Sequence, residues 1–227
     1  MATNTPHDPR PSSLPPRPSP LAPPTIHIVD DDDSFRRAVS RLLQAAGFAV
    51  QGYASAGEFL LVHSGERPGC VLLDVQMPGL DGLELHAALA KQAVPLPVVF
   101  VTGHGDIPMS VRAMKTGAVD FLTKPVKREA LLRAVEAALA QDAAQRSAHE
   151  KSRHYRACFD GLTPREREVF EQVTAGKLNK QIAAELGTAE RTVKAHRANI
   201  MEKMQVQSLA ELVHIAAQLK SETRSVQ

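Results

Sequence analysis

Tryptophan is absent from the chain, and only 4% of its residues are aromatic. A protein that binds single-stranded nucleic acid by stacking bases needs aromatic side chains, so this composition disfavours that class. Cysteine is nearly absent as well: Cys70 and Cys158 lie far apart and lack the spacing of metal ligands. We expect a small buried apolar side chain at Cys70 and a thiol in a linker at Cys158.

Long apolar runs are also missing. None approaches the roughly 18 residues that a membrane span needs, and the N-terminus lacks the apolar region of a secretory signal. We therefore expect a cytoplasmic protein with no membrane partner. Neither sign of charge predominates, because 27 Lys and Arg stand against 25 Asp and Glu, for a formal net charge of +2. Any basic surface for a polyanion must therefore be local.

The chain does contain enough apolar residues to build packed cores. Of its 227 residues 43% are hydrophobic, which suits one large domain or two modest ones. Pro and Ser dominate the first 24 residues, which cannot bury enough apolar surface to offset their conformational entropy. A polyproline ligand is the alternative to disorder there. We expect a disordered Pro-rich tail at 1–24, an α/β domain at 25–140, a helical linker at 141–160, an all-α domain at 161–220 and a short tail at 221–227.

Two periodicities alternate in the first domain. Short apolar runs that fit strands buried on both faces occupy 25–29, 70–75 and 95–103, with weaker candidates at 48–53 and 118–124. Between them, helical spacing appears at 35–46, 82–92, 110–117 and 128–141, the first through Phe35, Val39, Leu42 and Ala46. Five βα units in succession predict a doubly wound, five-stranded parallel sheet covered by helices on both sides.

The second domain contains no convincing strand. The sequence "TPRE" at Thr163–Glu166 combines three helix-start signals: Thr as N-cap, Pro at the first helical position and Glu closing a capping box. Gly176 and Gly187 separate short helices, and a longer helix is expected from about Ala189 to Met204. The segment from Asn179, the turn at Gly187 and the following helix have the dimensions of a helix-turn-helix.

Polar side chains gather where the predicted strands end. Ligands of an open parallel sheet lie beyond the carboxyl ends of its strands. Asp30 and Asp31 follow the first strand, Asp74 follows the third, and Thr102 and Lys124 end the fourth and fifth. Carboxylates there suit a hard ion such as Mg²⁺. With the hydroxyl and the ammonium they would hold a phosphoryl group, which one Asp would accept covalently.

Each of these residues also has a simpler explanation. The run Asp30–Asp33 can be a helix start enriched in acids, which the helix dipole favours. A single Lys such as Lys124 is usually solvated. Five compatible residues at successive strand ends are harder to explain in this way.

Five motifs follow one another along the chain in a specific order and spacing: "IVDDD", "LLDVQMPGLDG", "VTGHGDIPMSVRAMKTGAVDFLTKP", "LTPREREV" and "NKQIAAELGTAERTVKAHRANIMEKM". In these motifs the chain resembles two-component response regulators, in particular the FixJ/StyR-like branch of the NarL/FixJ group. The resemblance covers nearly all of residues 25–219 and implies a CheY/flavodoxin-like receiver followed by a helix-turn-helix domain of the LuxR/NarL type.

The resemblance also implies roles for the acidic cluster. Asp74 is then the phosphoacceptor, and it shares a Mg²⁺ site with Asp30, Asp31 and the backbone carbonyl of Gln76. Asp32 and Asp33 lie past this site, at the start of the first helix.

The resemblance assigns further residues to the phosphoryl group. Thr102 and Lys124 bind its oxygens, and Gly103 leaves it room. Phe121 is the aromatic residue whose burial reports phosphorylation, and the Lys124–Pro125 peptide bond is cis. Gln76 and His104 flank the acceptor, where they would set how easily water attacks it, although His104 can equally be an ordinary loop residue.

The long helix of the second domain has two faces. A step of about 100° per residue puts Ala189, Val193, His196, Ile200 and Met204 on the core side. The opposite side carries Arg191, Ala195, Ala198 and Glu202, flanked by Lys194 and Asn199. Small alanines permit close approach to base edges, and Arg and Lys donate to guanine.

The resemblance makes this helix the recognition helix, against the alternative of a solvated, mildly charged helix. We expect Arg191, Lys194 and Asn199 to contact bases, and Lys180, Thr192 and Arg197 to contact phosphates. The final helix, residues 208–219, either pairs two domains across DNA or supports the helical core.

These features predict a phosphorylation-activated transcriptional regulator. It would take a phosphoryl group on Asp74 from a sensor histidine kinase with Mg²⁺, form a homodimer and bind double-stranded promoter DNA, with RNA polymerase as a further partner. It would be no enzyme beyond its own phosphorylation and dephosphorylation. Two alternatives are a Mg²⁺-dependent phosphatase, whose second acid two residues after Asp74 is lacking here, and a constitutive DNA-binding or scaffold protein, against which the complete pocket argues.

Overall fold

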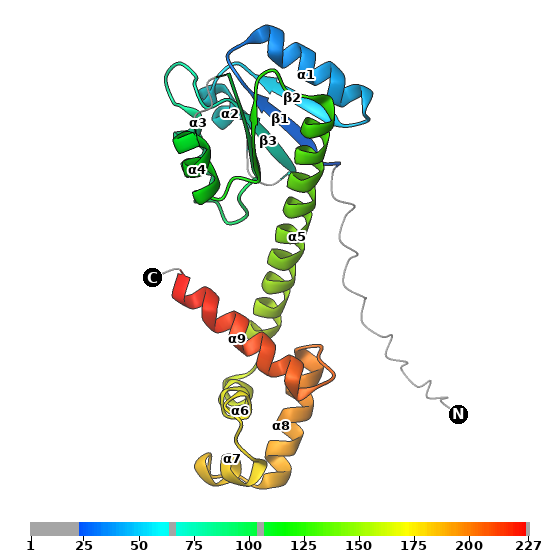
Figure 1. The fold of residues 1–227 in the computed structure, drawn as a ribbon. Coiled ribbons are helices and arrows are strands. Elements are labelled where there is room, and N and C mark those ends of the chain that lie inside the picture. The colour runs from blue at the N-terminus through cyan, green and yellow to red at the C-terminus, as the bar shows by residue number, and fades with distance from the viewer. Residues whose placement is uncertain (1–22, 64–66, 104–106, 226–227) are drawn as a thin grey trace, which may run out of the picture. The chain divides into compact units, whose positions relative to one another are not determined.

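The computed structural model describes residues 23–63, 67–103 and 107–225. Most of the expected N-terminal tail, and His104, lie outside these residues. The chain forms two compact units, the first ending at Asp142 and the second beginning at Ala143, and each is described by itself. Figure 1 labels their helices and strands.

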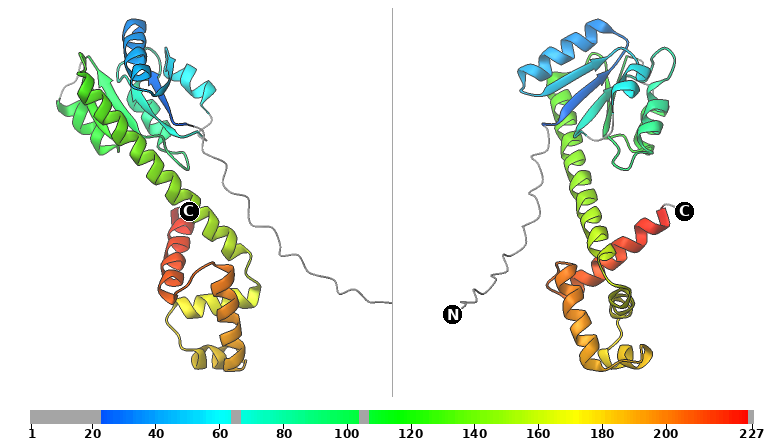
Figure 2. Two further views of the ribbon diagram at one scale, coloured as in Figure 1. Left: turned by 90° about the vertical axis from the view of Figure 1, so that its right-hand side faces the viewer. Right: turned by 180° about the vertical axis from the view of Figure 1, so that it is seen from behind.

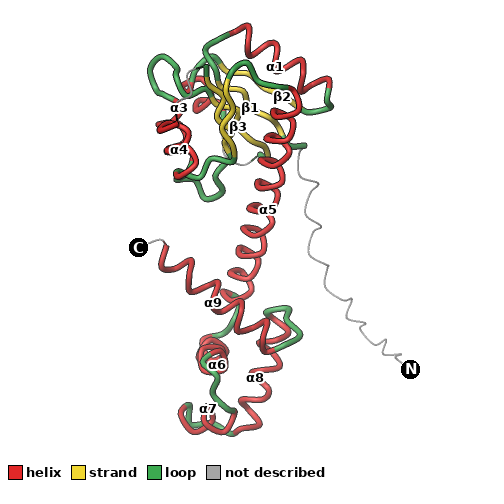
Figure 3. The backbone as a smooth tube through the Cα atoms, viewed as in Figure 1, coloured by secondary structure: helices red, strands yellow, loops and turns green. Residues whose placement is uncertain are grey.

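The first unit is built around a parallel sheet. Five strands lie in the order β2-β1-β3-β4-β5, and every pairing is parallel. They appear as the yellow centre of this unit in Figure 3. All the expected strands are confirmed, because an apolar run buried on both faces marks each central strand. Their bounds are β1 Thr25–Val29, β2 Ala49–Tyr53, β3 Gly69–Leu73, β4 Val98–Thr102 and β5 Asp120–Thr123.

Helices cover both faces of the sheet, which confirms the doubly wound α/β fold. Side chains of α1 and α5 pack with one face, and side chains of α2, α3 and α4 pack with the other. The two helical layers can be compared in the two views of Figure 2. Their bounds are α1 Asp33–Ala45, α2 Ala56–Val62, α3 Gly82–Leu89, α4 Ile107–Lys115 and α5 Arg128–Asp160.

Two details of these helices differ from expectation. The α1 face is centred on Val39 and Leu43, so Leu42 is only half-buried and Ala46 is exposed at the C-cap. No helical pattern marked α2, because it is short and its Leu61 is 89% exposed. The last helix, expected at 128–141, continues without a break to Asp160, so the segment expected as a helical linker at 141–160 is helical.

In the second unit, all the regular secondary structure of the described residues is helical. After the end of α5 come α6 Pro164–Thr174, α7 Asn179–Glu185, α8 Glu190–Lys203 and α9 Leu209–Ser225. The capping box of Thr163 and Glu166 is present, with Pro164 at the start of α6. Gly187 adopts φ +61° between α7 and α8, a backbone conformation that glycine takes without a side-chain clash. The helix-turn-helix is therefore confirmed.

An apolar core joins the helices of the second unit. It includes Val169, Phe170, Ile182, Val193 and Ile200, all buried. No helix in the described ranges is both long and apolar enough to cross a membrane.

Candidate functional site

The register of the sheet brings the acidic residues together. Val29 of β1 pairs with Leu73 of β3, so Asp30 and Asp74 follow side by side on neighbouring strands. The Asp74 amide donates to the Val29 carbonyl at 2.9 Å, which extends the ladder to the acid itself. One carboxylate oxygen each from Asp30, Asp31 and Asp74 lies within 4.8 Å of the others. Residues separated by 44 positions in the sequence thus share one pocket.

Lys124 bridges two of these acids. Its Nζ donates to Asp30 Oδ2 at 2.6 Å and to Asp74 Oδ2 at 3.1 Å. Its backbone amide donates to the Thr102 carbonyl at 2.8 Å, which places Lys124 beside the end of β4. The expected meeting of acids, hydroxyl residue and lysine at one edge of the sheet is therefore what the structure shows.

Burial shapes the electrostatics of the pocket. Asp30 is 1% exposed, and burial raises its pKa although the hydrogen bond from Lys124 opposes that rise. Burial alone would lower the pKa of Lys124, but its hydrogen bonds to Asp30 and Asp74, together with their charges, outweigh burial and raise it. The ammonium therefore stays charged and partly compensates the buried carboxylates.

The donor set fits a hard divalent cation. Three carboxylates supply oxygen ligands, and their spacing lets one ion touch all of them. Asp30 and Asp74 are buried, whereas Asp31 is exposed, so an ion can enter from the solvent side. Gln76 is next to this group, and its backbone amide donates to Asp74 Oδ1 at 3.3 Å.

The remaining pocket residues lie at the same edge. Thr102 is buried at the end of β4. A Cβ added to Gly103 would meet nothing within 4 Å, so this position is open. Phe121 is half-buried in β5, with its ring centroid 6.4 Å from that of Phe100. The Lys124–Pro125 bond is cis.

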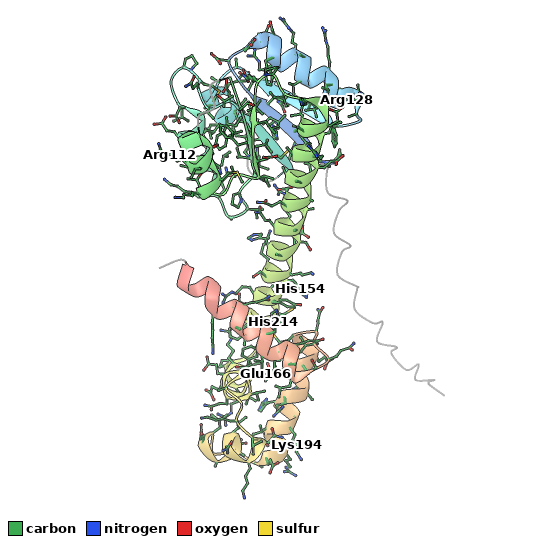
Figure 4. The ribbon with its side chains drawn as sticks, viewed as in Figure 1. Arg112, Arg128, His154, Glu166, Lys194 and His214 are labelled. Carbon is green, nitrogen blue, oxygen red and sulfur yellow. The ribbon has the colours of Figure 1, made fainter. Side chains whose placement is uncertain are left out.

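The outer face of α8 is exposed as predicted. Arg191, Lys194 and Asn199 are exposed, and within the described residues no hydrogen bond or ion pair holds their side chains. Lys194 lies on the outer side of α8 in Figure 4. The alanines between them, Ala195 and Ala198, are exposed as well.

The core face of α8 needs one correction. Val193, Ile200 and Met204 are buried, and His196 is half-buried. Ala189 was predicted on the core side, but it is exposed because it is the N-cap of α8, with extended backbone angles that take it out of the helical periodicity.

Known families match both units. The response regulator receiver domain matches residues 26–136, and the family described as bacterial regulatory proteins, luxR family, matches residues 160–216. Nodulation protein W of Bradyrhizobium diazoefficiens is 44% identical over 86% of each chain. The chain is a response regulator.

Further relatives agree with this family. The transcriptional regulatory protein FixJ of Bradyrhizobium diazoefficiens is 44% identical over 84% of this chain and 93% of its own. The solved structure of the response regulator StyR matches with a TM-score of 0.76 at 48% identity, over 87% of this chain and 100% of that one. This response regulator therefore combines a receiver domain with a LuxR-family DNA-binding domain, and it regulates transcription.

Three residues that support the receiver pocket were missed from the sequence. Phe35 and Arg36 reach the pocket from the first turn of α1. Gly82 starts α3, where a Cβ would collide with the backbone carbonyl of Asp74. The capping pair of Asp81 and Glu84 around this glycine was the available signal, since it marks where α3 begins.

The phosphate-contact residues predicted in the DNA-binding domain have different surroundings. Lys180 is exposed and Thr192 is half-buried. Arg197 Nη1 donates to Asn179 Oδ1 at 2.8 Å, which ties α8 to the start of α7. The response regulator thus uses this arginine to fix the two helices of the motif to each other.

A buried carboxylate of α6 also stabilises the helix-turn-helix, through a contact with the end of α8. Glu166 is 3% exposed, and Lys203 at the end of α8 donates to its Oε2 at 2.7 Å. This hydrogen bond, with those from Thr163, lowers the pKa of Glu166 to about 2. Figure 4 labels Glu166 within this helical unit.

Proposed function

We propose that Asp74 accepts a phosphoryl group from a sensor histidine kinase in a Mg²⁺-dependent step, and that the phosphorylated protein dimerises and binds promoter DNA through α8. The observation that carries the proposal is the bridge of Lys124 between Asp30 and Asp74 beside a third carboxylate. A structural ion pair needs one acid, whereas here one lysine bridges two carboxylates and a third lies beside them.

The transfer uses few groups of the chain. An Asp74 carboxylate oxygen forms a bond to phosphorus as the bond between phosphorus and the kinase histidine nitrogen breaks. Lys124 stays beside Asp74 and neutralises charge on the phosphoryl oxygens, and Thr102 binds another oxygen. Asp30, Asp31, Asp74 and the Gln76 carbonyl would hold Mg²⁺, which supplies positive charge to the transferring group.

Coupling to DNA binding would run through the α4–β5 side of the receiver. Thr102 moves toward the phosphoryl group, and Phe121 turns inward from its half-buried position. Val111 and Met114 of α4 are 45% and 47% exposed, so this side already presents apolar surface to a second copy. Two helix-turn-helix units then bind two half-sites, since one alone has little interface.

The DNA-binding domain would read promoter DNA with its exposed helix face. Arg191, Lys194 and Asn199 are proposed to contact bases, and Lys180, Thr192 and Arg197 phosphates. FixJ is named a transcriptional regulatory protein, which supports a promoter as the target. RNA polymerase is proposed as the further partner.

Replacing the acceptor tests the first step. We expect Asp74→Asn to gain no acid-labile phosphate from a kinase or from acetyl phosphate with Mg²⁺, because the amide cannot form the acyl phosphate. Phosphate is measured by intact mass, and solution mass by light scattering should double when the wild type is phosphorylated but stay unchanged for Asp74→Asn. Asp160→Asn, an exposed acid of the second unit, is the matched control. Phosphate on Asp74→Asn at the wild-type level would refute the assignment.

A further inference from the structure

An aromatic ring lies against the ammonium that bridges the acids. Lys124 Nζ is 4.3 Å from the ring centroid of Phe35. This distance is within the range in which a cation is attracted to the negative face of an aromatic ring. Nothing in the receiver's acid chemistry requires an aromatic side chain at this place, so the contact needs its own explanation.

The first turn of α1 holds the ring in position. Asp32 is the N-cap, and its carboxylate accepts hydrogen bonds from the amides of Ser34 at 2.9 Å and Phe35 at 3.2 Å. Arg36 Nη1 donates to the Asp30 carbonyl at 2.7 Å. Phe35 is also packed against the apolar cluster between α1, α5 and the sheet. The Phe35 ring is therefore fixed relative to Asp30, which follows β1, the strand next to β3 and Asp74.

The ring differs from the other neighbours of Lys124 in one respect. The attraction from Asp30 and Asp74 changes whenever these carboxylates bind a cation or Asp74 is phosphorylated. The quadrupole of the Phe35 ring neither titrates nor coordinates, so its attraction for the ammonium persists through each of these states.

We propose that Phe35 is a positioning residue, whose ring face keeps the Lys124 ammonium at the phosphoryl site while its carboxylate partners change. The inference rests on the proposed function, since it concerns how Lys124 serves the transfer to Asp74. The competing explanation is that Phe35 only fills space under α1, in which case its electronic character has no effect.

Fluorinated phenylalanines separate the two explanations. Each ring fluorine weakens the negative face with little change in shape. In the full-length protein, we expect one, two and three fluorines at position 35 to slow phosphorylation by acetyl phosphate with Mg²⁺ step by step, to about three- to tenfold for the trifluoro ring. Phe35→Tyr should keep most of the rate, and Phe35→Leu should fall at least as far as the trifluoro ring. The melting temperature should not follow the fluorine series.

Phe48 provides the matched control. It is half-buried against the same apolar cluster, and within the described residues no cation lies over its ring, so the same fluorines there should leave the rate unchanged. A rate independent of fluorine number at position 35, or an equal series at position 48, would overturn the proposal.

A second measurement does not depend on phosphorylation. Ring currents from Phe35 should shift the Lys124 Hε resonances upfield, and Phe35→Leu should remove that shift. Hε resonances that stay unchanged in Phe35→Leu would show that the ring does not contact the Lys124 ammonium. If the wild type gains no phosphate on Asp74, the proposed function fails, whereas normal wild-type phosphorylation with a flat fluorine series refutes only the role of Phe35.

Discussion

The receiver pocket and the outer face of α8 are built in opposite ways. In the pocket, Lys124 is tied to two acids and the backbone approaches closely around Asp74. On the outer face of α8, Arg191, Lys194 and Asn199 are exposed, and no hydrogen bond or ion pair within the described residues restrains their side chains. A change in the pocket should therefore affect stability and function together, whereas a change on the α8 face should affect DNA binding alone.

The largest effect is expected at Gly82, where the receiver leaves no room. A Cβ there collides with the Asp74 carbonyl, and backbone must move to admit it. We expect Gly82→Ala to lower the free energy of unfolding of the receiver by about 3 kcal/mol and to slow phosphorylation, because the displaced backbone carries the acceptor. Urea unfolding and phosphorylation by acetyl phosphate measure the two losses.

Gly57→Ala in α2 is the control for Gly82. Its added Cβ would meet only the Ser55 hydroxyl, at 3.9 Å, so it should be neutral or slightly stabilising. If Gly82→Ala kept wild-type stability, the close packing of α3 on the acceptor would not constrain the pocket.

Acid should unfold the two units over different pH ranges. Burial, with a smaller effect of His63, lowers the pKa of His27 to about 4 from 6.5. The unfolded state therefore binds the proton first, and the receiver loses stability as pH falls from about 6.5 to 4, by about 3 kcal/mol. The depressed pKa of Glu166 stabilises the DNA-binding unit fully above about 4.5, and this contribution is lost as pH falls through about 2.

NMR in urea, which follows resonances of each unit separately, measures these two curves. His27→Gln should flatten only the receiver curve. Lys203→Met should flatten only the other, since it removes the main hydrogen bond to the Glu166 carboxylate. Loss of stability in both units over one common pH range would contradict the assignment of these groups.

The smallest effect on stability is expected on α8. Lys194→Ala should weaken binding to specific promoter DNA by about 1–3 kcal/mol and non-specific binding by less, with the free energy of unfolding unchanged. Titrations of both DNAs at one salt concentration provide the comparison. Lys151→Ala, which removes an exposed lysine of α5 in the second unit, away from the outer face of α8, is the control. Equal losses on both DNAs would make Lys194 a phosphate contact.

Sequence patterns predicted what depends on strand ends and helix periodicity. The apolar runs located all five strands, and the rule that ligands lie at their carboxyl ends brought Asp30, Asp74 and Lys124 together. The buried and exposed sides of α8 followed from its period. The prediction that Ala189 is buried was wrong, because a residue at a helix cap does not follow that period.

The features that sequence patterns could not predict depend on how helices and strands pack against one another. Phe35 lies 89 positions from Lys124, and only the packing of α1 decides that its ring faces the ammonium. Gly82 matters because α3 approaches β3 closely, a distance that no pattern encodes. The helix α2 was not located, since Leu61 points into solvent and hides the apolar period.

The bridge of Lys124 has a consequence for the electrical balance of the receiver. Three ionised carboxylates and one ammonium leave the pocket with an excess of two negative charges. A divalent ion held there would cancel that excess, so the cation-loaded receiver would be locally neutral and could admit an incoming anion. The proposed phosphorylation of Asp74 would replace one negative charge by about two and leave the pocket negative again. That extra negative charge would attract nearby hydroxyl and amide hydrogens, which a neutral modification of the same aspartate could not do.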